Sequence, residues 1–124
     1  MTPGDLLQIG EVARSTGITV SAVRYYDEIG VISTVTRVGG KRRFAPETVG
    51  RVNFILRAQE AGFSLDDIRT VLDDTAGEWR DLVEKKLHEL IERRNRLDTM
   101  IAMVTEIRDC GCDAVASCPS VSSF

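Results

Sequence analysis

Residues 8–29 read QIGEVARSTGITVSAVRYYDEI, a stretch in which two short amphipathic segments flank a glycine. Apolar residues share one side of the first segment, at helical spacing: Ile9, Val12 and Ala13. Gly17 marks a tight turn, and Thr19 is of the residue type that caps a following helix, which we expect to run to about Ile29. Two short helices joined by a glycine-bearing turn predict a helix-turn-helix.

The next segment, residues 31–45, has the composition of extended chain. Its first half is mostly β-branched, which favours strands. Gly39-Gly40 is a hairpin signal, because both residues tolerate positive φ. Four cations lie around this turn: Arg37, Lys41, Arg42 and Arg43. We therefore expect a small basic ribbon, the wing, directly after the helix pair.

Residues 46–74 predict two further helices that connect the wing to the rest of the chain. Pro46 suits the first position of one helix. Ser64 caps the other, with Asp67 three residues on as the second member of a capping box. Residues 1–74 thus form the winged helix-turn-helix domain of a mainly α chain.

A long helix is predicted over residues 75–109. Thr75 and Glu78 form a capping box at its start. Apolar residues alternate spacings of three and four along it: Val83, Leu87, Leu90, Leu97, Ile101 and Val104. Such a seam is typical of a coiled coil, and the helix is too long to pack against the small N-terminal domain alone. We infer a homodimer held by this dimerisation helix; the alternative is a helix buried within its own chain.

Charge is distributed unevenly along the 124 residues, whose formal net charge is −3. Residues 1–58 carry 8 Lys and Arg against 5 Asp and Glu. Residues 59–124 carry 8 Lys and Arg against 14 Asp and Glu. The whole-chain value therefore conceals a basic front half, which favours a local polyanion-binding face.

The basic half contains the residues that a DNA-binding surface needs. In a helix-turn-helix the first turns of the second helix approach the base edges. Those positions hold Ser21, Ala22, Arg24, Tyr25 and Tyr26. Arg24 either reads a guanine or holds a phosphate, and each tyrosine either packs in the core or contacts DNA. The wing cations would hold the flanking phosphates, which position a protein more than they specify sequence.

Several motifs, in order, carry a resemblance to a known family. They are Ile9-Gly10-Glu11-Val12-Ala13, Val23-Arg24-Tyr25-Tyr26-Asp27, Gly39-Gly40-Lys41-Arg42-Arg43-Phe44 and Ala61-Gly62-Phe63-Ser64-Leu65-Asp66-Asp67-Ile68. The sequence resembles the MerR family of transcription regulators over about residues 7–110. The family wing usually reads Gly-Tyr-Arg-Xaa-Tyr, and the equivalent stretch here is Gly40-Lys41-Arg42-Arg43-Phe44. The glycine and an arginine are therefore present, while Lys41 stands in place of a tyrosine.

The resemblance implies a fold and a mode of action. It implies a homodimer built by an antiparallel coiled coil and a pseudo-palindromic site in double-stranded promoter DNA. It also implies that an inducer makes the dimer distort the DNA, which realigns the promoter for RNA polymerase. The effector site of the family lies in the segment after the long helix.

That segment, residues 110–124, holds all three cysteines: Cys110, Cys112 and Cys118. A clustered, odd set of thiols is typical of a metal or redox site, and incidental thiols are the plainer alternative. Pro119 suits the first position of a short helix with Cys118 at its cap, which favours thiolate. Thiolates select soft ions such as Cu(I) and Zn(II).

The resemblance leaves the effector open among several classes. Cys110 and Cys118, with Pro119 after them, resemble the loop of the copper-type members, which bind monovalent ions with two thiolates. Zinc and mercury members add a cysteine from the partner chain at the start of the long helix, where this chain has Thr75. Iron–sulfur members carry four cysteines, and the first would fall at Ile107, so a 2Fe-2S cluster lacks its usual fourth ligand. A thiol–disulfide switch is the other redox alternative.

Composition excludes several classes of protein. A content of 43% hydrophobic and 28% charged residues is that of a folded chain. No apolar run approaches the roughly 20 residues of a membrane helix, and the first residues do not resemble a signal peptide, so we expect a cytoplasmic protein without a membrane partner. A thiol oxidoreductase built on Cys110-Gly111-Cys112 is a remote alternative, because no βαβ pattern surrounds the motif; we expect no enzyme.

Overall fold

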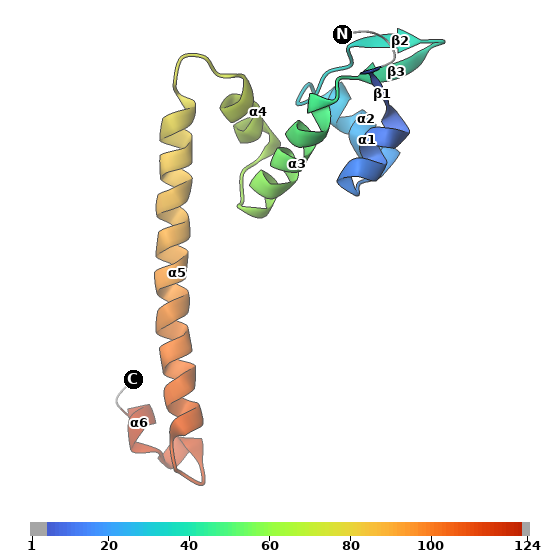
Figure 1. Ribbon diagram of the computed structural model, residues 1–124. Helices are drawn as coiled ribbons and strands as arrows, with labels where there is room; N and C mark the ends of the chain where they lie inside the picture. The colour runs from blue at the N-terminus through green and yellow to red at the C-terminus, as the bar shows by residue number, and fades with distance from the viewer. Residues whose placement is uncertain (1–4, 123–124) are drawn as a thin grey trace. The chain divides into compact units, whose positions relative to one another are not determined.

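A computed structural model describes residues 5–122 of the chain. It divides into two compact units, residues 1–83 (unit 1) and residues 84–124 (unit 2), which are described separately. Unit 1 contains a small sheet and four helices, and unit 2 contains most of one long helix and a short terminal segment (Figure 1). The prediction of a winged helix-turn-helix followed by a long helix is confirmed.

The helix-turn-helix consists of α1 (Ile9–Thr16) and α2 (Val20–Glu28). Gly17 closes α1 with a φ of 76°, a left-handed conformation that costs glycine no steric penalty. The Thr19 hydroxyl accepts a hydrogen bond from the Ala22 N–H at 3.1 Å, which confirms Thr19 as the cap of α2. The turn and the cap therefore fix how α2 follows α1.

The wing consists of β2 (Thr36–Val38) and β3 (Lys41–Phe44), paired antiparallel around Gly39-Gly40. These glycines have φ values of 58° and 78°, as the hairpin prediction requires. A third strand, β1 (Leu7–Gln8), pairs with the other edge of β3, giving the strand order β1-β3-β2. The sequence analysis did not anticipate β1, which anchors the wing to the residues directly before α1.

Helices α3 (Glu47–Glu60) and α4 (Leu65–Asp73) complete the core of unit 1. Ser64 and Asp67 form the predicted capping box at the start of α4. The fully buried side chains come from every part of the unit: Val12, Val23, Val31, Ile32, Phe44, Val52, Ile55 and Ile68. Because Phe44 is the last residue of β3, the same core that joins the helices also holds the base of the wing.

Helix α5 (Trp79–Asp109) begins later than predicted, and a different residue caps its start. The Asp74 carboxylate accepts hydrogen bonds from the N–H groups of Ala76 and Trp79, both at 2.8 Å. Gly77 adopts a φ of 90° between them. The expected capping box of Thr75 and Glu78 was therefore wrong, because the carboxylate one residue earlier takes the free N–H groups of the turn.

Helix α5 has 31 residues and no buried side chain. The side chains of the predicted seam are all exposed by a third or more, up to 63% for Val104. Ile91, Met100 and Met103 add to the exposed apolar area. No helix within residues 5–122 has the length and apolar character needed to cross a membrane.

The chain after α5 forms a 3₁₀ helix, η2 (Val115–Ser117), and a short helix, α6 (Pro119–Ser122). Pro119 opens α6 as predicted, and Cys118 directly precedes it. The Val121 N–H donates to the Cys118 carbonyl at 3.1 Å, which ties this turn to the cysteine.

Candidate functional site

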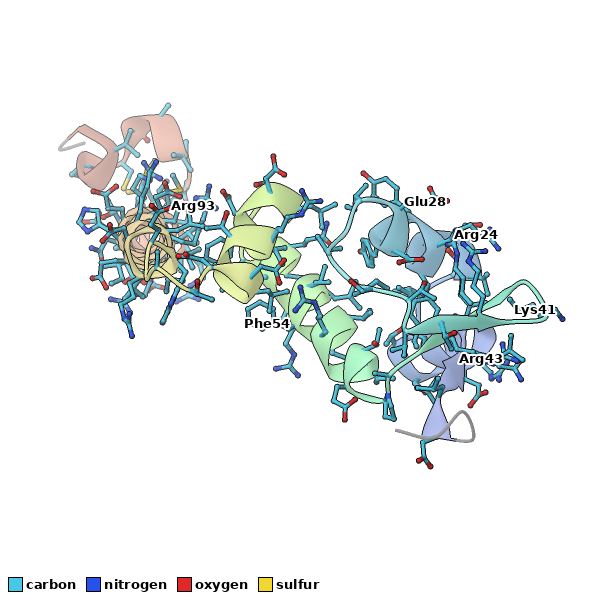
Figure 2. The ribbon with its side chains drawn as sticks, turned by 90° about the horizontal axis from the view of Figure 1, so that it is seen from above. Arg24, Glu28, Lys41, Arg43, Phe54 and Arg93 are labelled. Atoms are coloured by element: carbon cyan, nitrogen blue, oxygen red, sulfur yellow. The ribbon has the colours of Figure 1, made fainter. Side chains whose placement is uncertain are left out.

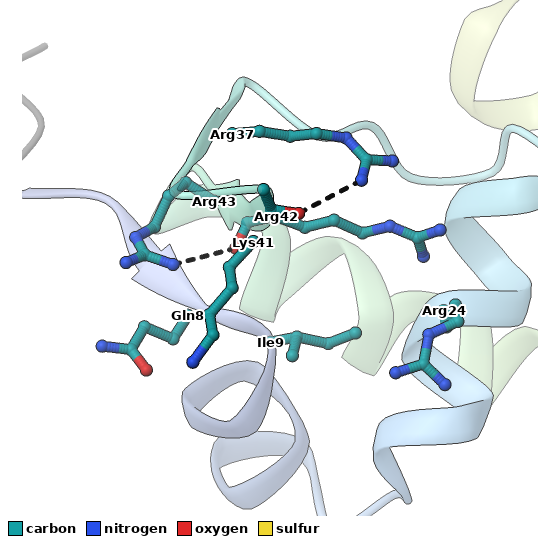
Figure 3. A pocket seen from close by; sticks show the side chains of 8 residues that line it. Gln8, Ile9, Arg24, Arg37, Lys41, Arg42 and Arg43 are labelled. Atoms are coloured by element: carbon teal, nitrogen blue, oxygen red, sulfur yellow. Dashed lines mark hydrogen bonds between the residues drawn. The ribbon is translucent and has the colours of Figure 1, made fainter.

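A basic pocket of about 430 Å³ lies in unit 1 between α2 and the wing. Its lining residues come from α2, the wing and the junction of β1 with α1: Gln8, Ile9, Arg24, Arg37, Gly40, Lys41, Arg42 and Arg43. Figure 3 shows Arg24 extending from α2 toward Ile9, and Arg42 reaching from the wing toward α2. Five cations around one hollow, with no acidic side chain in its lining, produce a site that attracts anions.

The residues predicted at the start of α2 lie largely at the surface. Ser21 and Arg24 are exposed, Ala22 is partly exposed, and Tyr25 is 50% exposed. In Figure 2 the labelled Arg24, Lys41 and Arg43 lie at the same end of unit 1, away from Phe54 on α3. The first turns of α2 and the wing therefore form one accessible face.

Tyr26 belongs to the core and not to this face. It is 7% exposed, and its hydroxyl donates a hydrogen bond to Gln59 Oε1 on α3 at 3.1 Å. Burial, and to a lesser degree the neighbouring Tyr25, raises the pKa of Tyr26 above its usual value of 10.0. Of the two roles that the sequence left open for this tyrosine, the structure shows the core role.

Arg42 faces α2 rather than the tip of the wing. Its Nε lies 3.4 Å from Asp27 Oδ2, and its Nη2 lies 3.7 Å from Glu28 Oε1. Asp27 also accepts hydrogen bonds from the Thr34 N–H at 3.2 Å and the Thr34 hydroxyl at 2.7 Å. The Asp27 side chain is only 16% exposed, so this group, the Asp27 clasp, is a partly buried link between α2 and the wing. Sequence reasoning placed Arg42 among the DNA contacts and did not identify Asp27 as its partner.

The other wing cations are better placed to meet a ligand. Arg37 donates to the Gly40 carbonyl and Arg43 to the Arg42 carbonyl, both over 3.4 Å, which orients the guanidinium groups without neutralising them (Figure 3). Lys41 is exposed beside the turn. These side chains keep their charge available to phosphate oxygens.

The three cysteines lie together at the end of unit 2. The Sγ atoms of Cys110, Cys112 and Cys118 all lie within 4.8 Å of one another, and none is in a disulfide. Cys118 is buried, Cys110 is partly exposed and Cys112 is exposed. The Cys112 N–H donates to Cys110 Sγ at 3.4 Å, so the backbone of the loop holds these two residues together. The structure thus unites the three predicted ligands in one cluster.

The Cys112 thiol resists ionisation beside the other two cysteines. The pKa of Cys112 is raised to about 12. The largest cause is a hydrogen bond with Cys110, and the second is a hydrogen bond with Cys118. Burial and the charge of the other two thiols are smaller causes. A bound cation reverses this preference, because it stabilises thiolates. Three soft sulfur donors fit a soft metal ion and do not fit Mg²⁺ or Ca²⁺, which take oxygen ligands.

Comparison with known proteins places the chain among regulators. Residues 7–75 match the family described as "MerR HTH family regulatory protein", and residues 49–107 match "MerR, DNA binding". A SoxR homolog of Chromobacterium violaceum, described as an HTH-type transcriptional activator, is 31% identical over 90% of this chain and 80% of that protein. The mercuric resistance operon regulatory protein of Pseudomonas fluorescens is 34% identical over 95% of this chain and 87% of that protein.

Solved structures agree with these sequence relatives. HiNmlR, described as a MerR family regulator lacking the sensor domain and solved bound to promoter DNA, matches with a TM-score of 0.59 and 25% identity. The match covers 90% of this chain and 98% of that one. These relatives are transcription regulators and not enzymes.

Proposed function

Because the chain belongs to the MerR family of helix-turn-helix regulatory proteins, we propose that it is a transcription regulator that binds promoter DNA as a homodimer and responds to a soft metal ion. The observation that carries the proposal is the presence, in one chain, of a basic pocket beside α2 and a cluster of three thiols after α5. The first supplies a DNA-binding face, and the second supplies a site for a thiophilic effector.

Helix α2 enters the major groove, and the wing holds the flanking backbone. Ser21, Ala22, Arg24 and Tyr25 are the exposed or partly exposed residues near its start that approach the bases. Arg37, Lys41 and Arg43 hold phosphates, while Gly40 lets the wing turn approach the backbone closely. Arg42 contributes mainly by joining the wing to α2 through the Asp27 clasp.

Dimerisation occurs along α5. The apolar seam is exposed in the single chain, and an antiparallel coiled coil with a second copy would bury it. A two-fold symmetric dimer reads a pseudo-palindromic site, because each subunit presents the same face to one half-site. Such a dimer acts on RNA polymerase indirectly, through the shape of the promoter DNA.

The effector is a thiophilic metal ion held by Cys110, Cys112 and Cys118. Cu(I), Zn(II) and other soft cations fit the donor set, and the bound ion neutralises thiolate charge that the loop disfavours without it. The ion acts as a ligand whose binding favours one state of the DNA-bound dimer. The proposed function implies that the protein is located in the cytoplasm, where promoter DNA is transcribed.

The test uses the reduced, full-length protein and a duplex from the region upstream of its own gene. We expect a shift of that duplex at low salt, and transcription in vitro that rises when Cu(I), Zn(II) or Cd(II) is added. Protein that binds the duplex but leaves transcription unchanged with every ion would contradict the metal response. Protein that does not bind the duplex at low salt would contradict DNA binding.

Two variants test the DNA-binding face, one on α2 and one on the wing. Arg24→Glu should abolish the shift, because it places a negative charge where α2 meets the groove. Lys41→Ala should weaken binding to all sequences alike and lower the slope of log affinity against log salt by about 0.9, as expected for one lost phosphate contact. Arg93→Ala, an exposed cation of α5, is the matched control and should change neither quantity.

A thiol redox switch is the second candidate function, and the short distances between the sulfur atoms favour it. The Sγ atoms of Cys110 and Cys112 each lie within 4.8 Å of Cys118 Sγ, so either thiol is a candidate to pair with Cys118. An iron–sulfur cluster, as a related redox effector, would need a fourth ligand beyond these cysteines. A response of transcription to oxidant in chelated, metal-free protein, reversed by dithiothreitol, would favour the switch over the metal ion.

A further inference from the structure

Arg51, on α3, joins two parts of unit 1 that are far apart in the sequence. Its Nε donates a hydrogen bond to the Val31 carbonyl at 2.6 Å, and its Nη2 donates to Asp73 Oδ1 at 2.7 Å. The Arg51 side chain is 32% exposed and that of Asp73 is 49% exposed, so the ion pair by itself adds little stability. We call the three residues together the Arg51 link, because one guanidinium joins the loop after α2 to the end of α4.

The Val31 side of the Arg51 link is attached to the C-terminal end of α2. Val31 is fully buried, and its N–H donates to the Tyr26 carbonyl of α2 at 3.0 Å. Gly30, between them, has a φ of 83°, and its N–H donates to the Asp27 carbonyl at 3.1 Å. Val31 is thus bound to α2 through its N–H and to Arg51 through its carbonyl, so the position of α2 follows that of Arg51.

The Asp73 side of the Arg51 link is attached to the junction between α4 and α5. Asp73 is the last residue of α4, and the next residue, Asp74, caps the start of α5. The Asp74 N–H donates to the Thr70 carbonyl of α4 at 3.0 Å, and the Asp74 carboxylate accepts the Trp79 N–H at 2.8 Å. The junction is therefore bonded to both helices, and Arg51 ties it to the end of α2.

The Arg51 link needs a guanidinium and not merely a positive charge. Two donors of one rigid, planar group are bonded to two different partners, a backbone carbonyl and a carboxylate. A lysine in this place would keep the charge, but its ammonium is a point charge on a flexible stem and does not hold two partners at a fixed separation. The bond to the Val31 carbonyl is also shorter than the usual N–H···O distance of about 2.9–3.0 Å, as charge-assisted bonds are.

The Arg51 link bears on how a dimer meets two half-sites. The proposed seam lies on α5, and α5 starts at the junction that Arg51 holds. Each base pair inserted between two half-sites moves one of them by about 3.4 Å and turns it by about 35° around the duplex. A dimer in which α2 is held firmly to the start of α5 therefore fits one separation of the half-sites and not its neighbours.

We infer that Arg51 is a positioning residue for DNA recognition: by holding the end of α2 to the junction of α4 and α5, it makes the dimer selective for one spacing of the half-sites. This inference rests on the proposed function in taking the chain as a homodimer on a pseudo-palindromic site. Arg51 acts through α2, because it lines neither the basic pocket nor the thiol cluster.

The first test measures the affinity of the full-length protein for three duplexes. One is the region upstream of its own gene, with the half-sites located by footprinting, and the others have one base pair added or removed between the half-sites. The wild type should lose at least about tenfold in affinity on either change, as expected when a duplex must be deformed to fit. Arg51→Lys should lose less than about threefold, because its α2 is free to adjust to either spacing.

Arg57→Lys is the matched control, since Arg57 is an exposed arginine of the same helix that takes no part in the Arg51 link. It should keep the spacing preference of the wild type. Thermal unfolding followed by circular dichroism checks that each variant is folded at the temperature of the assay. Arg51→Lys that discriminates between the spacings as strongly as the wild type would overturn the inference, and so would an equal loss of discrimination in Arg57→Lys.

The second test removes the other end of the link. Asp73→Ala takes away the acceptor at the junction and leaves the bond between Arg51 and Val31 in place, so it should relax the spacing preference as Arg51→Lys does. Asp66→Ala is its control, because Asp66 is a carboxylate of the same helix whose side chain is 94% exposed. A wild-type spacing preference in Asp73→Ala would overturn the inference.

Failure of the inference is distinguishable from failure of the proposed function. Wild-type protein that does not bind the natural duplex, or binds all three duplexes equally, would contradict the proposed dimer on a pseudo-palindromic site, and the inference with it. Wild-type protein that discriminates between the spacings, together with Arg51→Lys that does so equally, would leave the proposed function intact and contradict only the role of Arg51.

Discussion

Unit 1 and helix α5 differ in how far their apolar side chains are exposed. In unit 1, eight large side chains are less than 2% exposed, and they come from helices, wing and loops alike. In α5, none of 31 residues is buried, although leucine, isoleucine, valine and methionine recur along its length. Unit 1 therefore has its own core, whereas α5 has an apolar surface that a single chain does not cover. The difference shows that unit 1 folds around its own core, and it motivates the proposal that a second copy covers the apolar side chains of α5.

The largest effect is expected from a charge in the seam. Ile101→Glu places a carboxylate at a side chain that is 61% exposed in the single chain and is buried in the proposed dimer. A homodimer carries the change twice, so association should weaken by about 3–6 kcal/mol, from about 1.5–3 kcal/mol per buried apolar side chain. Sedimentation at micromolar concentration should then show one chain.

Thr99→Glu is the control for this variant, because it adds the same charge on the face opposite the seam. It should sediment as the wild type does. If the two variants were both dimeric or both monomeric, the result would contradict a seam on one face of α5.

Truncation of the core of unit 1 should have the next largest effect. Phe44→Ala empties a fully buried position at the base of the wing and should lower the free energy of unfolding by about 3–5 kcal/mol. Val35→Ala, at a side chain that is 55% exposed just before the wing, should change it by no more than about 0.5 kcal/mol. Chemical denaturation measures both values, and similar losses would show that the wing is not part of the core.

A smaller effect is expected at Arg51, which joins parts of unit 1 far apart in sequence. Its Nε donates to the Val31 carbonyl at 2.6 Å, and its Nη2 donates to Asp73 Oδ1 at 2.7 Å. Arg51→Met keeps the aliphatic stem but removes both bonds, so stability should fall by about 1–3 kcal/mol. Arg57→Met, on the same helix, is the comparison and should lower stability less. An equal loss of stability in both variants would mean that helix propensity, and not the two hydrogen bonds of Arg51, causes the effect.

The smallest effect concerns pH and the start of α5. Hydrogen bonds from backbone N–H groups, that of Ala76 first, hold the pKa of Asp74 below its usual value of 3.8. A carboxylate with a lowered folded-state pKa stabilises the protein above its unfolded-state pKa, and this contribution disappears as pH falls through the folded-state value. The difference in unfolding free energy between wild type and Asp74→Ala should therefore be constant from pH 7 to about pH 5 and shrink below about pH 4. A difference that grows in acid would contradict the role of the charged form.

Local signals explain what the sequence predicted well. Thr19 as a cap, Gly39-Gly40 as a turn and Ser64 with Asp67 as a capping box each act within four residues. Such features depend on backbone geometry that neighbouring residues determine alone. The proximity of the three cysteines was also predictable, because they lie within nine residues of one another.

Features that depend on tertiary structure were not predictable in this way. The pairing of Arg42 with Asp27 joins residues separated by β2 and the wing turn, and the bonds of Arg51 span about twenty residues in each direction. Strand β1 is two residues long and exists only because β3 offers an edge. At the start of α5, two adjacent positions carried plausible caps, and only the fold shows that Asp74 takes the N–H groups.

The Asp27 clasp has a consequence for how a duplex is recognised. Asp27 on α2 holds both Thr34 and Arg42, so α2, which we propose enters the groove, and the wing, which we propose holds the backbone, move together. The separation between a base contact and a flanking phosphate contact is then determined by the protein. A duplex whose minor-groove width or twist does not match that separation pays a deformation energy, even with the same contacted bases. Sequence preference would therefore extend to base pairs that no side chain touches.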